Sequence, residues 1–520
     1  MKPNDIVDAL NDVDPTLVGD SAPGAAKKKK KTGVIAARVA ALAAALAVII
    51  GVGAVAAKRA ADKPTPSVPS QTGETNRNKN GAPEDGAQPT DVQPVQQDDE
   101  ANALLKALTA FAAEYPSQPK YPENGDMSDE DEMDAWYEAL RERREKCYGA
   151  GISLYPFFSR SLSAFLDGKA GENSVCSPLN IYFSLAMLAE ISGGETRAQV
   201  LSLLGANDIE TMRTQANKVF NANYRNDGSA FCILADSLWM NEDVDFKDDT
   251  LKTLAESYYA SSFSGKPGTE EFDTAVREWI NGQTGGLLKD YVSEIKSDPL
   301  TMISLYSTAY FGDKWQAEFS ADSTEQGVFH SPSGDTDAEF MKETNLWGEY
   351  YWGESFGAVK KDLQQNETVW FILPDEGVSP EELLEDAETL DFLFTMNKEA
   401  DWNNFKRLRV HLSVPKFDVS SKRSLKEGLE KLGVTDCFTE KADFTPLTDT
   451  KPVAVSDINH GARVIADEKG VTAAAYTEMM LAGAAMPPEE EMEFTLDRPF
   501  IFAVMSEDRM PLFVGIVNDP

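Results

Sequence analysis

The sequence contains few of the residues on which enzymes and metal sites depend. It has three histidines and four cysteines in 520 residues. No histidine stands in an HExxH motif, and neither a GxSxG turn nor a Walker or dinucleotide-binding loop occurs. The cysteines form no CxxC pair, which argues against a zinc or redox site, and their spacing leaves the disulfide state open. These residues are His330, His411, His460, Cys147, Cys176, Cys232 and Cys437. The sequence therefore predicts a protein that is not an enzyme and needs no metal or cofactor.

Positive charge is also scarce. The chain has 49 Lys and Arg against 86 Asp and Glu, a net charge of -37. Nine Lys or Arg and five Asp lie in residues 1–59, a balance of +4, which leaves -41 for the rest. Such a surface repels other polyanions. We therefore expect no nucleic-acid partner and no activation by a heparin-like polyanion.

An apolar run near the N-terminus, residues 33–57, follows the lysine cluster Lys27–Lys31. A helix of about 20 apolar residues spans a bilayer core. The lysines would hold residues 1–32 in the cytoplasm and place the rest on the extracellular side of the membrane. The alternative is a signal peptide cleaved near Ala56, which would make the protein secreted. The run is longer than the apolar part of an ordinary signal peptide, so we favour a transmembrane helix or signal anchor.

Three regions follow with different compositions. Residues 58–100 have no aromatic side chain and are rich in Pro, Gln and Asn, which predicts a disordered linker. Residues 101–150 contain two stretches of helical periodicity and predict a helical extension packed on the domain. Residues 151–520 carry helical patterns early and strand patterns late, without a βαβ repeat. This order predicts a mixed α+β domain.

The segment from Glu468 to Pro488 has the pattern of a buried strand and the position of a loop. From Val471 onward, residues that alternate with a period of two form an apolar face; the other face carries the only charge, Glu478, and the only aromatic ring, Tyr476. Two prolines end the segment and three glutamates follow it, which is typical of an exposed loop. Its Ala, Leu and Met content also favours a surface helix, the competing interpretation. The apolar face consists of Val471, Ala473, Ala475, Thr477, Met479 and Leu481. A strand-like segment on a loop is a candidate for conditional insertion into a sheet.

Several blocks between residues 150 and 520 occur in the order typical of one family. They are Asn173–Ile181, Gly193–Thr196, Trp279–Asn281, Tyr310–Trp315, Leu429–Gly433, Glu468–Ala475 and Arg498–Phe502. By these blocks the sequence resembles the serpins, a family of serine protease inhibitors. The resemblance implies an α+β serpin fold, with a large central β-sheet, two smaller sheets, about nine helices and an exposed C-terminal reactive loop. We expect a monomer of prokaryotic type, either anchored in the membrane through residues 33–57 or secreted.

The resemblance also implies a mechanism. A serine protease attacks the reactive loop and forms an acyl-enzyme, and the cut loop, residues 470–484, inserts into the central sheet and traps the protease in a 1:1 covalent complex. At the family's usual offset from the hinge, the scissile bond is Ala484–Ala485, and Pro487 and Pro488 fit this offset. A small residue at the cleavage position suits elastase-like proteases. The alternative is a non-inhibitory serpin that acts as a cell-surface binding or structural module. It would predict bulky or charged residues at Val471, Ala473 or Ala475, and there are none.

The resemblance implies structural roles for three groups of residues. The loop hinge comprises Glu468, Lys469, Gly470, Val471, Thr472, Ala473, Ala474 and Ala475. The sheet-opening cluster comprises Ser177, Asn180, Ser307 and His460, and the upper-sheet lock comprises Trp315, Lys416 and Glu468. The family usually has Ser where this chain has Asn180, and Asn where it has Ser307. This exchange would keep the total of donors and acceptors. We expect His460 to be a buried, hydrogen-bonded residue without a catalytic role.

Overall fold

The computed structural model describes residues 99–118, 120–121, 130–147, 149–166, 171–395, 402–471 and 488–520. The predicted N-terminal tail and apolar run lie outside these residues, as does the predicted linker except for its last two residues, Asp99 and Glu100, which begin a helix. Among the described residues, no helix is long and apolar enough to cross a membrane. The longest described helix, α4 (Glu130–Cys147), is rich in charged residues. The predicted location on the extracellular side of a membrane is therefore contradicted, and we withdraw it.

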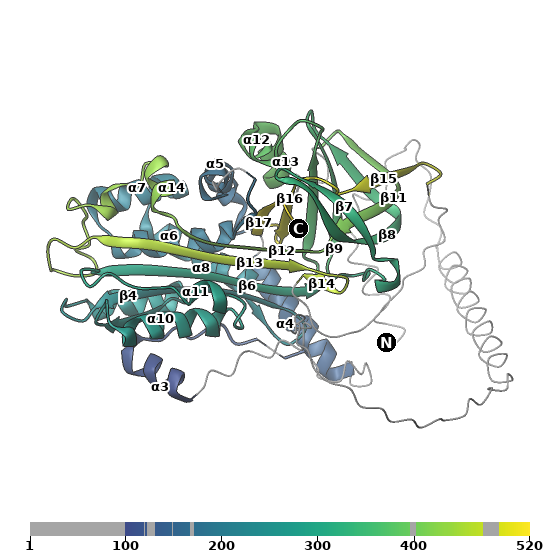
Figure 1. Ribbon diagram of the computed structural model, residues 1–520. Helices are drawn as coiled ribbons and strands as arrows, with labels where there is room; N and C mark the ends of the chain where they lie inside the picture. The colour runs from purple at the N-terminus through teal and green to yellow at the C-terminus, as the bar shows by residue number, and fades with distance from the viewer. Residues whose placement is uncertain are drawn as a thin grey trace, which may run out of the picture. The chain divides into compact units, whose positions relative to one another are not determined.

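The central sheet has eight strands in the order β1-β5-β4-β6-β14-β13-β12, with β3 paired to β4. They are β1 (Thr109–Phe111), β3 (Arg225–Asn226), β4 (Phe231–Asn241), β5 (Ser261–Gly265), β6 (Ile303–Lys314), β12 (Phe417–Ser424), β13 (Val455–Ala466) and β14 (Gly470–Val471). Figure 1 shows the long strands β6 and β13 side by side, with β14 at one end of both. β6 and β13 run parallel to each other, and β14 runs antiparallel to both.

The second sheet has nine strands in the order β15-β11-β8-β9-β10-β16-β17-β2, with β7 paired to β8. They are β2 (Ser174–Cys176), β7 (Glu325–Ser331), β8 (Gly334–Trp352), β9 (Phe356–Asp362), β10 (Thr368–Pro374), β11 (Phe405–Pro415), β15 (Glu491–Thr495), β16 (Phe500–Met505) and β17 (Pro511–Val517). The expected two smaller sheets are joined here because β8 is 19 residues long and pairs with β7, β11 and β9 in succession.

The helices are interspersed with the strands along the chain. Besides α4 they are α3 (Asp99–Leu108), α5 (Tyr155–Leu166), α6 (Pro178–Ile191), α7 (Gly194–Leu204), α8 (Ile209–Asn223), α9 (Asp248–Ser257), α10 (Glu270–Gln283), α11 (Lys289–Val292), α12 (Pro380–Glu385), α13 (Ala387–Thr395) and α14 (Lys426–Lys431). Short 3-10 helices lie at Ile152–Leu154, Ala321–Ser323 and Asp436–Phe438. This mixed architecture confirms the predicted fold class.

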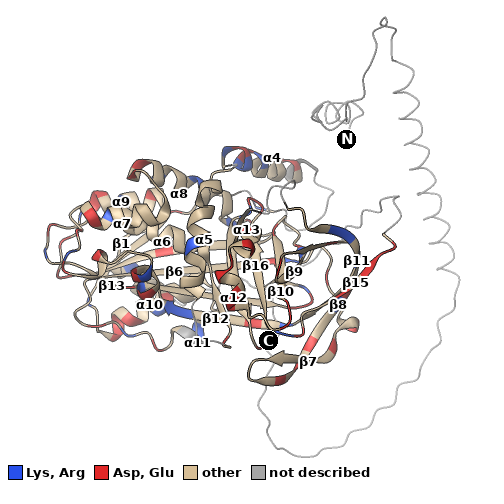
Figure 2. Cartoon of the chain, turned by 90° about the horizontal axis from the view of Figure 1, so that it is seen from above, with Lys and Arg blue, Asp and Glu red and all other residues tan. Residues whose placement is uncertain are grey.

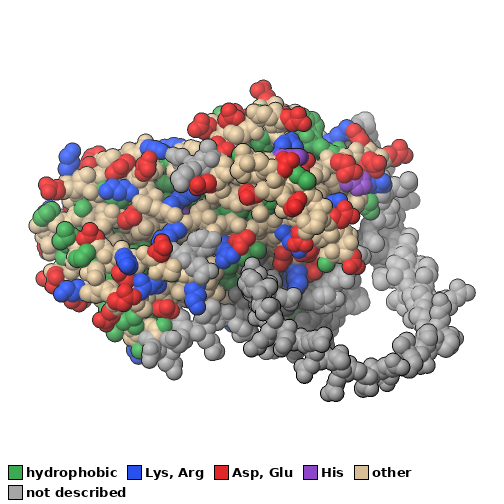
Figure 3. All heavy atoms as spheres, in the orientation of Figure 1, with side chains coloured by type: hydrophobic (Ala, Val, Ile, Leu, Met, Phe, Trp, Pro, Cys, Tyr) green, Lys and Arg blue, Asp and Glu red, His purple; other side chains and the backbone are tan. Residues whose placement is uncertain are grey.

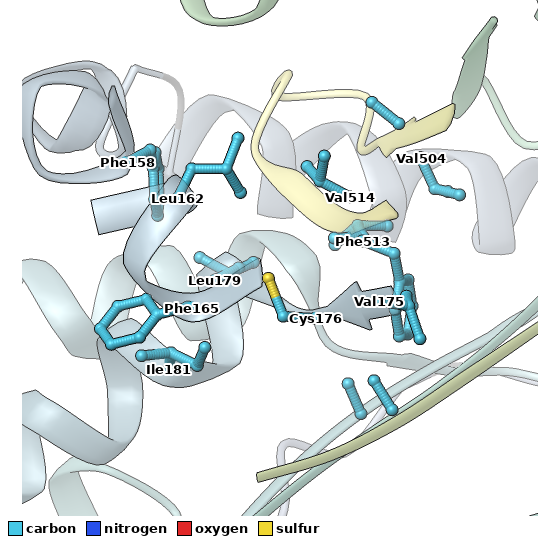
Figure 4. Close-up of a cluster of buried hydrophobic side chains, with 14 of the residues drawn as sticks. Phe158, Leu162, Phe165, Val175, Cys176, Leu179, Ile181, Val504, Phe513 and Val514 are labelled. Carbon is cyan, nitrogen blue, oxygen red and sulfur yellow. The ribbon is translucent and has the colours of Figure 1, made fainter. Parts of the chain in front are cut away.

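Helix α6 is buried along its whole length, as expected for a helix that is apolar on nearly every side. It begins with Ser177 as N-cap and Pro178 in the first turn, two preferred starting residues. The helix packs against β4 and β6 of the central sheet and against β17 of the second sheet. Figure 4 shows Leu179 and Ile181 of α6 among apolar side chains of α5, β2 and β17. Through these contacts α6 packs between the central sheet and the second sheet.

The predicted extension, residues 101–150, contacts the rest of the domain through several of its elements. β1 adds an edge strand to β5, and α3 packs against α10. α4 packs against α8, and the indole nitrogen of its Trp136 donates to Asp227 at 3.3 Å. These contacts are additional to the elements that the family resemblance implied.

Candidate functional site: the seam between β6 and β13

The line along which β6 and β13 face each other, called the seam here, has two different halves. In the lower seam the strands pair directly, from Val455 with Ile303 to Gly461 with Thr308. In the upper seam β14 lies between them, because Val471 pairs with Asp313 on one side and with Ala466 on the other. The sheet is thus closed in its lower half and already parted in its upper half.

A tight turn feeds β14 into this gap. The Asp467 carboxylate accepts hydrogen bonds from the amides of Lys469 and Gly470, at 2.8 and 3.2 Å. The Asp467 amide in turn donates to the carbonyl of Gly470 at 3.1 Å. Side chains of Asp stabilise turns in this way. The hinge residues Glu468 to Val471 are therefore held as a turn and the first two residues of a strand.

The upper-sheet lock closes around this turn. Lys416 and Glu468 form a salt bridge at 2.8 Å, and Thr324 also donates to Glu468 at 2.9 Å. Trp315 is fully buried; its indole nitrogen donates to the carbonyl of Asp467 at 2.8 Å and its amide to that of Lys469 at 3.1 Å. Partial burial alone would raise the pKa of Glu468, but its hydrogen bonds with Lys416 and Thr324 hold it below its usual value. The structure thus brings all three residues of the predicted lock together.

The four residues of the sheet-opening cluster also meet, beneath the lower seam. The amide of Ser177 donates to Nε2 of His460 at 2.9 Å, and the amide nitrogen of the Asn180 side chain donates to Oγ of Ser307 at 2.7 Å. Nδ1 of His460 lies 3.3 Å from the same hydroxyl. With Asn at 180 and Ser at 307, the two side chains thus form an amide-to-hydroxyl hydrogen bond at this place.

The protonation of His460 follows from its neighbours. Burial, with a smaller contribution from Arg423, lowers the pKa of His460 to about 3, so the ring is neutral. Nε2 accepts from a backbone N–H and must be unprotonated. The single ring proton is then on Nδ1, which donates to Ser307. The ring bridges α6, through its N-cap, and β6, so it joins a helix to the seam.

Two members of this cluster were not predicted from the sequence. Asp236 of β4 lies opposite Ser307, is fully buried and accepts a short hydrogen bond from Ser184 of α6. Burial raises the pKa of Asp236 to about 7, although hydrogen bonds from Ser184 and Ser307 oppose the rise. A signal was present, because an acidic residue inside the apolar run Phe231–Asn241 is unusual for a buried strand.

Several predicted positions lie outside the described residues. These are the hinge residues Thr472, Ala473, Ala474 and Ala475 and the predicted scissile pair Ala484 and Ala485. Their roles stay predictions. Elsewhere, all four cysteines are buried free thiols, so no disulfide joins them. No group of His, Cys, Asp and Glu in the described residues could hold a metal ion.

A mixed α+β fold whose central sheet is parted at one end by a short strand, β14, defines a class of protein. Comparison with known proteins specifies the class. The family model described as "Serpin (serine protease inhibitor)" matches residues 156–520, and the chain belongs to this family. The family is described as one of serine protease inhibitors, which agrees with a protein that is not a catalyst.

Similar proteins agree with this assignment. The chain is 29% identical over 374 residues to the plasma serine protease inhibitor of Mus musculus, covering 70% of this chain and 89% of the relative. It is 28% identical over 367 residues to the leukocyte elastase inhibitor of Bos taurus, covering 67% and 93%. Among solved structures, the thermophilic serpin tengpin in its native state superposes with a TM-score of 0.63 at 25% identity, covering 80% of this chain and 99% of that one. The relatives leave the prokaryotic type as a prediction.

Proposed function

We propose that this protein inhibits serine proteases as a suicide substrate, by insertion of its cut reactive loop into the seam. The observation that carries the proposal is the position of β14 between β6 and β13. Val471 already pairs on both sides, as a residue of an added central strand must, and Gly470 pairs with Lys314 of β6. The lower seam is the part that still has to open.

The register of β14 specifies where each further loop residue would go. Val471 pairs with Asp313 of β6 and with Ala466 of β13, and β14 is antiparallel to both strands. If this register continues, each later loop residue lies opposite the preceding residue of β6 and of β13. Leu481 would then lie opposite Ile303, and Ala482 opposite Val455, at the far end of the seam. The predicted scissile bond, Ala484–Ala485, follows directly. The available length of the seam thus supports insertion of residues 470–484.

The same register separates inward from outward side chains. Along β13, His460, Ala462, Val464 and Ala466 are buried while the residues between them are half-buried. Val471 is buried opposite Ala466, so the loop face that begins with Val471 would face inward. Every member of that face is apolar or threonine, which suits a buried position. Thr477 would meet His460 and Ser307, where its hydroxyl has polar partners.

Tyr476 is the bulkiest residue of the loop, and the register gives it a suitable place. It would face outward between Thr308 and Gly461, and the latter has no side chain. At present the Leu288 side chain covers Gly461, since a Cβ added there would lie 3.0 Å from its Cδ1. Arg463 also donates to the carbonyl of Leu287 at 2.8 Å. The connection between α10 and α11 would therefore have to move aside as the loop enters.

The chemistry follows the serine-protease pathway. The protease serine would attack the Ala484 carbonyl, form an acyl-enzyme on Ala484 and release the new amino terminus at Ala485. Insertion replaces one ladder of hydrogen bonds in the lower seam by two, each worth about 1 kcal/mol net. This gain would drive the protease to the far end of the sheet before water completes the reaction. A small residue at the cleaved bond, and the resemblance to an inhibitor named for leukocyte elastase, favour an elastase-like target.

The test is a denaturing gel of the full chain mixed with pancreatic or neutrophil elastase. A covalent complex of inhibitor and protease that survives SDS is expected. Ala475→Glu would place a charge on the inward face and should convert the protein into a cleaved substrate without a complex. Ala474→Glu, one residue earlier on the outward face, is the matched control and should keep the complex. Equal behaviour of the two variants would refute the register, and clean cleavage of the wild type by both proteases would refute the inhibitory function.

A further inference from the structure

Two neighbouring apolar side chains project from β8 into solvent. Leu346 and Trp347 are 46% and 45% exposed. They form a bulge, because Asn345 pairs with Val410 and Gly348 with Leu408, which leaves two residues of β8 opposite the single residue Arg409. The Asn345 side chain accepts from the amide of Trp347 at 3.0 Å and so helps to shape the bulge. Bulges of this kind redirect side chains and are common beside functional sites.

The bulge lies close to the point where the reactive loop rejoins the domain. β11 pairs with β8 along one edge and with β15 along the other. There Arg409 of β11 pairs with Glu491, the first residue of β15, and the Arg409 amide donates to the carbonyl of Glu490 at 2.8 Å. The bulge is therefore two strand spacings, about 10 Å, from the end of the loop. The predicted scissile bond precedes β15 by only a few residues. A protease held at that bond must extend over this end of the sheet.

An acidic groove lies on one side of the bulge, while β11 opposite it carries Lys406, Arg407 and Arg409. Beside β15 lies a groove of about 690 Å³ between β7, β8, β11 and β15. Its carboxylates are Asp322, Glu325, Glu343, Glu493 and Asp497. Its lining has one lysine, Lys342, which pairs with Glu325 at 2.6 Å, and from outside the lining Lys361 pairs with Glu343 and Arg498 with Asp497. Figure 2 shows acidic residues along β15, and Figure 3 shows acidic side chains gathered over this end of the molecule.

We infer that the Leu346–Trp347 bulge and the acidic groove form an exosite, which binds the basic surface beside the substrate cleft of the target protease. The inference rests on the proposed function and adds a second contact to the loop. An exposed tryptophan is a common anchor of protein interfaces, and a ring of charged residues around it is typical of their rims. Opposite charges steer the two partners together and raise the association rate. The exosite thus selects the protease by its surface charge, independently of the residue at the scissile bond.

The test measures the second-order rate constant of complex formation with neutrophil elastase and with pancreatic elastase, as a function of salt. Trp347→Ala should lower the rate about tenfold with the faster protease. Glu493→Gln should lower it less and should reduce its dependence on salt. The stoichiometry of the SDS-stable complex should not change for either variant. Leu300→Ala, which is 84% exposed at the opposite end of the seam, and Glu271→Gln on α10 are the matched controls and should leave the rate unchanged.

A binding measurement separates this inference from the proposed function. Each elastase with its catalytic serine replaced by alanine cannot form an acyl-enzyme, yet it should bind the full chain, and Trp347→Ala should weaken that binding. Weakened binding without any covalent complex from the active proteases would keep the exosite and refute the inhibitory mechanism. Rates and affinities of Trp347→Ala and Glu493→Gln that equal those of the wild type would overturn the exosite, as would failure of both inactive proteases to bind.

Discussion

The two halves of the seam hold the same pair of strands in different ways. The lower seam is closed by backbone pairing and by a buried polar cluster that joins α6 to β6. The upper seam is held by the turn at Asp467, by Trp315 and by one partly exposed salt bridge. Removing one partner of a buried hydrogen bond lowers the free energy of unfolding strongly, whereas a partly exposed ion pair contributes little to it. The difference predicts that the lower seam sets the stability of the closed sheet and the upper seam guides the entry of the loop.

The largest effect should follow removal of the His460 ring. His460→Ala leaves the Ser177 amide without its acceptor, deprives Ser307 of a donor and opens a cavity. We expect the free energy of unfolding to fall by about 2–4 kcal/mol. Urea unfolding of the full chain measures it, with His330→Ala as the control because that ring lies at the surface in an ion pair. If His460→Ala lowers the free energy of unfolding no more than the control His330→Ala, the cluster does not hold the lower seam.

A smaller effect should follow substitution in the upper-sheet lock. Glu468→Gln removes the salt bridge with Lys416, and we expect a loss of about 1 kcal/mol at neutral pH. Because the pKa of Glu468 is lowered in the folded protein, its contribution is present above its unfolded pKa and is lost as the pH falls through the folded value. Lys406→Gln, which breaks an exposed pair with Glu490, is the control. Equal losses in the two variants would assign the lock no special role.

The lock variant also tests the guiding role of the upper seam. Glu468→Gln should lose inhibitory activity faster than the wild type on incubation at raised temperature, since the turn that feeds β14 is held less firmly. His460→Ala should show the larger change in unfolding. If the two variants exchanged these effects, the division of roles between the halves of the seam would be reversed.

Much of this comparison could be predicted from the sequence, because the residues fall in recognisable blocks with strong periodicity. The alternating pattern from Val471 onward predicts a strand, of which only Val471 lies among the described residues, and the family blocks placed Ser177 near His460. What the sequence could not provide were contacts between distant segments. The pairing of Asp236 with Ser184, and the joining of two small sheets through β8, depend on which strands become neighbours. The bulge at Trp347 depends on a local count of residues on two paired strands, which no single stretch of sequence specifies.

The smallest predicted effect concerns pH and isolates Asp236. Because burial raises its pKa to about 7, the folded state binds a proton that the unfolded state releases at lower pH. Stability therefore falls as the pH rises through the folded pKa, and the loss between pH 6.5 and 8 should be at most about 1 kcal/mol. His460 acts in the opposite direction and chiefly below pH 6.5, since its pKa is lowered to about 3. Asp313 and Glu367, whose pKa values burial also raises, keep part of the dependence in any variant. The informative quantity is thus the difference in unfolding free energy between the wild type and Asp236→Asn, measured at pH 6.5, 7 and 8. It should change across this range in favour of the variant at high pH, and a constant difference would mean that Asp236 does not titrate there and that the lower seam holds an ionised carboxylate throughout.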